Sequence, residues 1–247
     1  MRDIEINLRV QRQHLYHLGF RCKTISRNTL ANANRVRPME VFADLAHHLI
    51  GVARLLYAND ATSAELKSLM GATVYVLDAA AIDLCLSLFS WALFRTTKAA
   101  IKLHTLMDLR GSIPSFIYIS DGKMHDVKVL DILAKQGYIE VGAYYVMDKA
   151  HVDFARLHHL HNARAFFVTR AKRNKKFKRR YSHPVDWINT AVLCDQTGVL
   201  TTHYSSQDYR TTMRRAVVKD DAGKRVVFLT NNFVLKPELI AELYRQR

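Results

Sequence analysis

The stretch GAYYVMDKAHVDFARLHHLHNARAFFVTRA, residues 142–171, decides the fold. It opens with an apolar run at 142–148, continues with VDFARLHHLHNA, whose apolar residues recur at helical spacing, and ends in a second run at 164–171. Both runs are short and rich in aromatic and β-branched residues, which favour strands. A strand, a helix and a second strand in this order predict a parallel β-α-β unit.

The residues before this unit extend it into a mixed sheet. The segments TVYVLD (73–78), IKLHTLMDL (101–109) and PSFIYIS (114–120) read as further strands, and a short turn at 109–112 joins the last two. HDVKVLDILAKQG, which ends in Gly137, predicts a second crossover helix. The fold class that follows is α/β, with an antiparallel hairpin edge and a parallel remainder.

Both ends of the chain add further elements. Residues 3–54 carry apolar stripes that predict helices, and the polar run 26–37 divides these stripes into two groups. Near the other end, PELIAELYRQR (237–247) predicts a helix with proline at its first position. Between them, a block of antiparallel hairpins is expected around Gly198 and the turn at 221–223, because four segments alternate or run apolar. These segments are 190–196, 199–206, 214–220 and 225–231.

Composition and charge narrow the class of protein. The chain has 247 residues, of which 49% are hydrophobic, and this excludes a disordered chain. A formal net charge of +15 predicts a polyanionic partner, most commonly a nucleic acid. The most apolar stretch, 74–94, contains two aspartates, which argues against a membrane span. Three scattered cysteines and a start without the apolar core of a signal peptide predict a cytoplasmic protein.

Two aspartates occupy matching places in the predicted sheet. Asp78 and Asp148 each follow an apolar run, at or near the end of a strand. If the two strands are neighbours, about 5 Å apart, their carboxylates converge at one edge. Paired carboxylates suit Mg²⁺ and phosphoryl transfer. The alternative is that each aspartate caps the residues that follow it, and the pattern leaves both interpretations open.

A dense basic run follows the second of these strands. It places eight positive charges within residues 170–180. We expect these side chains to track DNA phosphates, although most charge runs are solvated turns. The residues are Arg170, Lys172, Arg173, Lys175, Lys176, Lys178, Arg179 and Arg180.

Four stretches carry a family resemblance. They are YVLDAAAIDLCLSLFSWA (75–92), TTKAAIKLHTLMDLRGSIPSFIYISDGKMHDVKVLD (96–131), YVMDKAHVDFARLHHLHNARAFFVTRAK (145–172) and the terminal LYRQR. The chain closely resembles bacterial insertion-sequence transposases of the DDE family. The branch is the one whose third motif is Tyr, two residues, Arg, three residues, Glu, six residues, Lys.

The resemblance implies a fold, an activity and partners. It implies a ribonuclease-H-like core with an all-β insertion before the last helix, and two Mg²⁺ ions, replaceable by Mn²⁺, that serve DNA cleavage and transfer of the 3′ end. The expected partner is double-stranded DNA, both transposon ends and target, bound by a dimer in a paired-end complex in the bacterial nucleoid. The regions are then a helical part (1–70), the catalytic core (71–172), the β-rich insertion (173–235) and the start of the last core helix (236–247).

Site residues carry over by position. Asp78 corresponds to the first catalytic aspartate and Asp148 to the second, and both would bind metal. Tyr244 and Arg247 fit the first two positions of the third motif. The glutamate of that motif would follow Arg247 by four residues, on the same helix face, so we expect a chain shortened at this end and, because family members carry further helical sequence, at its start.

Several departures and alternatives accompany the resemblance. The family has glycine two residues after the second aspartate, where this chain has Ala150, and neither Glu238 nor Glu242 lies where the third carboxylate belongs. A catalytically inactive fragment that only binds DNA is the main alternative. A nuclease with a third carboxylate inside the chain is another, with Asp83, Asp121 and Asp126 as candidates. Trp187 could stack on a displaced base, but we favour a tryptophan buried in a hairpin.

Overall fold

The computed structural model describes residues 2–22, 24–57, 73–84, 87, 92–95, 98–172 and 176–247, and divides the chain into two compact units, Met1–Val52 and Ala53–Arg247. The first unit is helical, as the sequence predicts. Its helices are α1 (Arg2–Val10), α2 (Arg12–His17), α3 (Arg27–Val36) and α4 (Glu40–Tyr57), the last of which continues into the second unit.

The polar run 26–37, which divides the apolar stripes in the sequence, forms the helix α3. The Ser26 side chain accepts a hydrogen bond from the Thr29 backbone nitrogen at 3.2 Å and caps the helix. None of the residues of α3 is buried, so a largely polar sequence is tolerated there.

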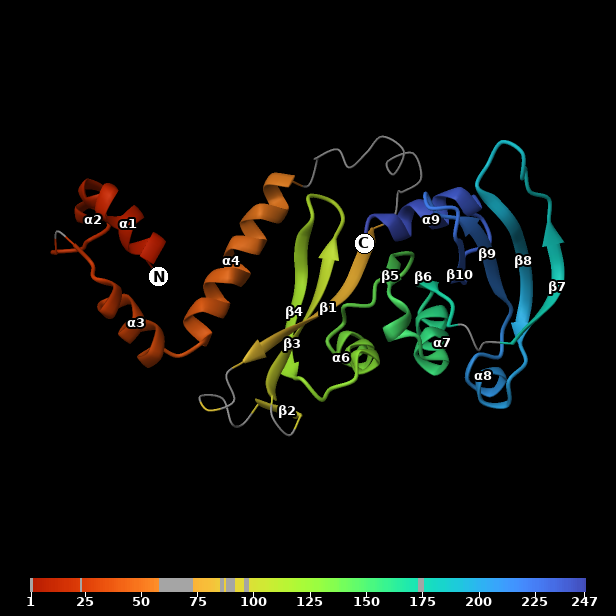
Figure 1. Cartoon of the computed structure of the whole chain (residues 1–247), viewed down its shortest axis with the longest axis horizontal. Coiled ribbons are helices and arrows are strands. Elements are labelled where there is room, and N and C mark those ends of the chain that lie inside the picture. Colours follow the sequence, from red (N-terminus) through yellow and green to blue (C-terminus); the bar gives the residue numbers. More distant parts are fainter. Residues whose placement is uncertain are drawn as a thin grey trace. The chain divides into compact units, whose positions relative to one another are not determined.

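The second unit is built on one mixed sheet (Figure 1). Among the described residues it has ten strands, in the order β2-β3-β1-β5-β6-β10-β9-β8-β7, with β4 also paired to β3. The strands are β1 (Val74–Leu84), β2 (Leu93–Arg95), β3 (Lys98–Asp108), β4 (Ile113–Asp121), β5 (Tyr144–Met147), β6 (Phe166–Arg170), β7 (Phe177–His183), β8 (Val192–Leu200), β9 (Met213–Lys219) and β10 (Arg225–Thr230).

The sheet confirms the mixed α/β fold. β5 pairs in parallel with both β1 and β6, whereas β1, β3 and β4 form an antiparallel edge. The order β4-β3-β1-β5-β6 is the ribonuclease-H-like arrangement that the resemblance implies. The predicted crossover helices are present as η2 (Asp126–Lys128) with α6 (Val129–Lys135), and as α7 (Phe154–Asn162).

Each face of the sheet carries its own apolar core, because side chains alternate along a strand. Tyr75, Leu77 and Met147 lie in one core together with leucines of α6 and α7. Val76 and Val146 lie in the other, together with residues of α9 (Pro237–Arg245). The last helix therefore packs on the face opposite to α6 and α7, and Pro237 begins it as predicted.

The β-rich C-terminal strands continue the same sheet, because β10 pairs with β6. Their assignment from sequence is partly wrong. β8 runs through Gly198 without a turn, and residues 203–208 form the short helix α8 (His203–Asp208) where a strand was expected. Alternation in VLTTHYSS therefore does not reflect a strand beyond Leu200.

Gly198 is required by a close approach between β7 and β8. A Cβ at this position would collide with the backbone oxygen of Lys178 and would lie 2.6 Å from the Phe177 ring. Gly198→Ala is expected to lower the free energy of unfolding by about 1–3 kcal/mol, because the strand must shift to make room. Urea unfolding measures this, with Gly51→Ala as the control, since a Cβ at Gly51 meets nothing within 4 Å. Equal stabilities of the two variants would contradict the prediction.

Candidate active site

The two predicted aspartates lie in one row across the centre of the sheet. Leu77 pairs with Met147, which pairs with Thr169 on its other side. The next residues along the chain are Asp78 on β1, Asp148 directly after the end of β5, and Arg170 on β6. Since these three residues follow neighbouring register positions, they share one face of the sheet. The expected convergence of the carboxylates is therefore present in the structure.

Asp78 does not lie at the end of its strand, contrary to the expectation. β1 continues to Leu84 because β3 pairs with it over its whole length, and Asp78 itself faces Thr105. What ends after Leu77 is the pairing with β5. The two carboxylates thus lie where the parallel part of the sheet stops.

Helix α9 brings the third-motif residues to this row. The Tyr244 hydroxyl donates to Asp148 Oδ1 at 3.2 Å, and Arg247 Nη1 donates to Asp78 Oδ1 at 3.0 Å. The Asp78 side chain remains 60% exposed. All four residues predicted to be catalytic therefore meet at one place.

The tyrosine connects both arginines of the site. The guanidinium carbons of Arg247 and Arg170 lie 5.3 and 5.9 Å from the centroid of the Tyr244 ring, within cation–π distance. Burial raises the pKa of Tyr244, and the Arg247 charge partly opposes this shift. Its hydroxyl therefore stays protonated at neutral pH and serves as a donor to Asp148.

Asp148 also caps the short helix that follows it, η3 (Lys149–His151). Its Oδ1 accepts the Lys149 backbone N–H at 2.6 Å. The capping interpretation is thus correct for Asp148, and it is compatible with a metal site, because the cap fixes the direction of the carboxylate. Two aspartates offer hard oxygen ligands, and Mg²⁺ commonly uses one or two carboxylates together with water and substrate phosphate. The residues present fit such an ion.

Two buried histidines lie near the aspartates, and sequence reasoning assigned them no role. His104, opposite Ala79, is 0% exposed and shares a 2.9 Å hydrogen bond with the Ser120 hydroxyl. His151 is 1% exposed, and neither of its ring nitrogens has a hydrogen-bond partner. Burial lowers the pKa of both rings. The signal available in the sequence was the position of His151, three residues after Asp148.

The buried His104 makes stability depend on pH. Its pKa lies below the ordinary value in the folded chain, mainly through burial, with Asp126 raising it and Lys102 lowering it. The unfolded chain then binds more protons below about pH 6.5, so stability is complete above that pH and is lost as the pH falls, by up to about 1.4 kcal/mol per unit. His104→Leu should reduce this dependence in urea unfolding at pH 7.5, 6.5 and 5.5, and leave the part that the buried His151 contributes. His203→Gln, an exposed histidine, should retain the wild-type slope; a full slope in His104→Leu would contradict the assignment.

None of the alternative third carboxylates joins the row. Asp126 is paired with Lys102 at 2.9 Å, and Asp121 accepts the Met124 backbone N–H. Asp83 is five residues beyond Asp78, about 16 Å along the strand. Within the described ranges, no group of three or more His, Cys, Asp or Glu side chains is placed to hold a metal ion. The nuclease alternative therefore gains no support from these residues.

The basic run is divided between two strands. Arg170 ends β6 beside the aspartates, whereas Lys178, Arg179 and Arg180 are exposed on β7, at the end of the sheet. Lys176 is also exposed, and Arg173 and Lys175 lie outside the described residues. Lys172 donates to the Val152 carbonyl at 3.0 Å. Basic residues that are close together in the sequence therefore lie on different parts of the sheet.

Trp187 is not buried, contrary to the interpretation that we favoured. It is 71% exposed in the turn between β7 and β8. Asp186 accepts hydrogen bonds from the Ile188 and Asn189 backbone nitrogens and holds this turn in shape. The ring is therefore presented to solvent on an ordered turn.

A buried ion pair positions the segment that leads into α9. Arg214 of β9 and Asp195 of β8 are each 4% exposed and make two hydrogen bonds to each other, at 2.7 and 2.8 Å. Arg214 also donates to the carbonyls of Asn232 and Leu235. Asn232 in turn donates to the Tyr144 hydroxyl at 2.7 Å. This network holds α9 on the sheet, and no local sequence pattern reveals it.

Comparisons with known proteins agree with the geometry. A protein of Sinorhizobium fredii named as a transposase is 28% identical over 221 residues, which cover 88% of this chain and 58% of the relative. A protein of Geobacillus stearothermophilus, named as the transposase of an insertion sequence element, is 29% identical over 181 residues, 70% of this chain and 44% of the relative. The chain thus spans about half the length of these relatives.

Solved structures give weaker likenesses. A piggyBac transposase synaptic complex with hairpin DNA has a TM-score of 0.40 and 10% identity, over 70% of this chain and 37% of that one. The NurA nuclease of Sulfolobus solfataricus has a TM-score of 0.36 and 9% identity, over 85% of this chain and 86% of that one. Neither likeness carries an argument.

Two further findings concern membrane-spanning helices and the protein family. No helix among the described residues has both the length and the apolar character needed to cross a membrane. The family model of the transposase DDE domain matches residues 70–247. That match includes both aspartates, Tyr244 and Arg247, and the chain therefore belongs to the transposase family with the DDE domain.

Proposed function

We propose that this chain carries the catalytic core of a DNA transposase that cleaves strands at the ends of an insertion sequence and transfers the 3′ ends to target DNA. The observation that supports this proposal is the row of Asp78 and Asp148 with Tyr244 and Arg247 bonded to it. Asp78 and Asp148 would bind divalent metal ions. The expected metal is Mg²⁺, which Mn²⁺ can replace. Two ions are expected, as in the family.

The residues of the site have separable roles in this proposal. When bound, the metal supplies Lewis acidity toward the phosphodiester and activates the attacking oxygen. Tyr244 orients Asp148 through its hydrogen bond, and Arg247 balances the charge of Asp78. Arg170 lies in the same row, where a guanidinium can bind a phosphate oxygen of the scissile strand.

The partners follow from charge and family. The net charge of +15 suits duplex DNA, both transposon ends and target. We propose a dimer that pairs the two ends, working in the bacterial cytoplasm at the nucleoid. The exposed basic residues of β7 would contact phosphates along the duplex. The four-region division, with boundaries after residues 70, 172 and 235, remains part of this proposal.

A second candidate is a protein that binds transposon ends without cutting them. Among the described residues, the row contains two carboxylates and no third. The exposed basic residues of β7 support this candidate, because contacts to DNA phosphates do not depend on the carboxylates.

A cleavage assay separates the two candidates. The 247-residue chain is incubated with duplex DNA that carries the flanking ends of its reading frame, with Mg²⁺ or Mn²⁺, and nicked strands are quantified. Strand cleavage that is lost in Asp78→Asn supports the transposase and excludes binding alone. Retention of the ends in a mobility shift, with no nicking under either metal, supports the binding protein and contradicts cleavage by these residues.

A further inference from the structure

Helix α9 is attached to β5 at both ends of that strand. Tyr144 is the first residue of β5, and its hydroxyl accepts a hydrogen bond from Asn232 Nδ2 at 2.7 Å. Asp148 directly follows the strand, and its Oδ1 accepts the Tyr244 hydroxyl at 3.2 Å. The two attachment points on the strand are about 13 Å apart. Because Asn232 precedes α9 and Tyr244 lies near its end, the two bonds hold the helix along the strand.

The buried Asn232 uses both polar atoms of its side chain to fix the segment that leads into α9. Its Oδ1 accepts the backbone N–H groups of Val234 and Leu235 at 2.9 and 2.8 Å, while Nδ2 donates to Tyr144. Since only the amide oxygen can accept backbone N–H groups, these bonds determine the orientation of the amide. The side chain therefore joins the first residue of β5 to the residues just before the helix.

The remaining contacts at the start of α9 leave its position along the strand open. Ile240 and Leu243 are buried in the core on this face of the sheet. Apolar contact has no preferred direction, whereas a hydrogen bond requires a defined distance and angle. In the part of the chain that the structure describes, the N-cap Lys236 makes no side-chain cap hydrogen bond. The start of α9 is therefore fixed from the preceding segment, through Asn232.

A small movement at the start of α9 becomes a larger one at its end. Arg247 lies about 15 Å beyond Pro237 along the helix axis, so a rotation of about 10° around the start moves it by about 2–3 Å. The bonds from Tyr244 to Asp148 and from Arg247 to Asp78 measure 3.2 and 3.0 Å. A side-chain hydrogen bond is lost beyond about 3.5 Å. A rotation of this size would therefore break the contacts of α9 with the aspartates.

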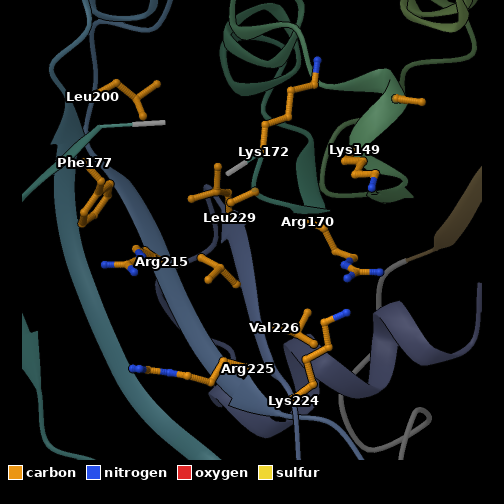
Figure 2. Close-up of a pocket in the computed structure, with 13 residues that line it drawn as sticks. Lys149, Arg170, Lys172, Phe177, Leu200, Arg215, Lys224, Arg225, Val226 and Leu229 are labelled. Carbon is orange, nitrogen blue, oxygen red and sulfur yellow. The ribbon is translucent and has the colours of Figure 1, made fainter. Parts of the chain in front are cut away.

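Tyr244 also supports a basic neighbour of the aspartates. The guanidinium carbon of Arg170 lies 5.9 Å from the centroid of the Tyr244 ring. Arg170 and Lys149 are among the residues that line a cationic cavity of about 1020 Å³ beside the row (Figure 2). The position of α9 therefore affects one wall of this cavity as well as the two carboxylates.

We propose that Asn232 and Tyr144 are positioning residues of the catalytic site. Their hydrogen bond sets where α9 lies along β5, and this placement brings Tyr244 to Asp148. Both residues act from the end of β5 opposite to the aspartate, through the helix. The inference rests on the proposed function, because that function gives the contacts of α9 their catalytic value.

The competing explanation is that Asn232 only stabilises the fold as a buried polar residue. The neighbouring Asn231 allows a direct comparison, because it is 5% exposed and Asn232 is 4% exposed. The Asn231 side chain accepts from the Phe167 backbone nitrogen at 2.9 Å and donates to the Ala165 carbonyl at 2.8 Å, so it binds the chain at β6. A role in stability alone predicts similar effects of both asparagines, whereas positioning predicts that only Asn232 affects Tyr244.

The first test observes Tyr244 directly, without metal or DNA. The 247-residue chain is prepared with 3-fluorotyrosine in place of Tyr244, and the fluorine NMR shift is recorded in EDTA. This ring lies close to two guanidinium groups, and its centroid is 5.2 Å from that of Phe228, so the shift reports its surroundings. Asn232→Leu and Tyr144→Phe should both move the resonance toward that of the urea-unfolded chain. Asn231→Leu should leave it at the wild-type position.

Tyr144→Phe decides the question even if Asn232→Leu fails to fold. It removes one hydroxyl and keeps the ring, whose centroid lies 4.9 Å from that of Phe166. Because both substitutions break the same bond, the double variant Asn232→Leu/Tyr144→Phe should move the resonance no further than Asn232→Leu alone. Val234→Ala, at a position that is 92% exposed in the same segment, is the second control and should leave the resonance unchanged.

Cleavage provides the functional readout. The rate at which duplex DNA that carries the transposon ends is nicked in Mg²⁺ is measured in the form of the protein that shows cleavage. Asn232→Leu is expected to lower this rate about tenfold or more, as for other residues that orient metal ligands. Tyr144→Phe should lower it about two- to tenfold, which corresponds to one hydrogen bond. Asn231→Leu should cleave at close to the wild-type rate, although urea unfolding should show a comparable loss of stability.

Two results would overturn the proposal. One is a wild-type fluorine shift in Tyr144→Phe and in folded Asn232→Leu, and the other is an equal displacement of the resonance in Asn231→Leu. Absence of cleavage by the wild-type protein, with the selective change of the Tyr244 resonance intact, would instead count against the proposed function alone.

Discussion

Asp148→Asn is expected to lower metal-dependent strand cleavage on the order of 10³-fold or more, and Asp78→Asn to do the same. A metal ion contributes several kcal/mol of transition-state stabilisation, and about 1.4 kcal/mol corresponds to a factor of ten in rate. Asparagine keeps the size of the side chain and can still cap η3, because Asn and Asp are equally good N-caps. The measurement is the rate at which duplex DNA that carries the transposon ends is nicked in Mg²⁺, by whichever form of the protein shows cleavage.

The matched control for this pair is Asp83→Asn, on the same strand. Asp83 lies outside the row, so its variant should cleave at the wild-type rate. DNA binding by Asp78→Asn and Asp148→Asn should not weaken, since each removes a negative charge from a surface that contacts phosphates. Cleavage within tenfold of wild type in either row variant would contradict the assignment.

Arg214→Leu is expected to lower the free energy of unfolding by about 3–5 kcal/mol, because it leaves Asp195 buried and uncompensated. The loss also removes two donors from the carbonyls that precede α9. Urea unfolding at pH 7 provides the measurement. The exposed Arg210→Leu is the control and should change stability by less than about 0.5 kcal/mol.

The double variant Arg214→Leu/Asp195→Leu tests the cause of this loss. Replacing both partners of a buried pair by apolar residues is often neutral, so the double variant should be more stable than Arg214→Leu. The double variant could instead lose as much stability, relative to the wild type, as Arg214→Leu and Asp195→Leu lose together. In that case the buried charge is not the cause, and the carbonyl contacts of Arg214 account for the effect.

The mixed sheet could be predicted because its signals are local. The runs around Tyr75 and Tyr145 carry enough aromatic and β-branched residues to indicate strands, and Gly137 marks the end of α6 with a backbone φ of +76°. The two aspartates could be matched for the same reason. The position of Arg170 beside them in the row could not be predicted, because register between strands depends on pairing over long sequence distances.

The failures have similar physical causes. The bounds of α3 within the helical region 3–54 were not predicted, because an exposed helix needs no apolar stripe, and its Ser26 cap is the signal that indicates them. Trp187 is exposed because Asp186 organises a turn, a contact within three residues that overrides hydrophobicity. The Arg214–Asp195 pair lies within segments read as hairpin strands, where nothing local distinguishes a buried charge from an exposed one.

The central claim is that Asp78 and Asp148 form one divalent-metal site, and binding of Mn²⁺ tests it most directly. Electron paramagnetic resonance counts free Mn²⁺ during titration of the 247-residue chain in the presence of duplex DNA, which supplies phosphate ligands. We predict saturable binding in the wild-type chain and in Asp83→Asn, and its loss in both Asp78→Asn and Asp148→Asn. Mn²⁺ binding that is unchanged in the two row variants would contradict the account.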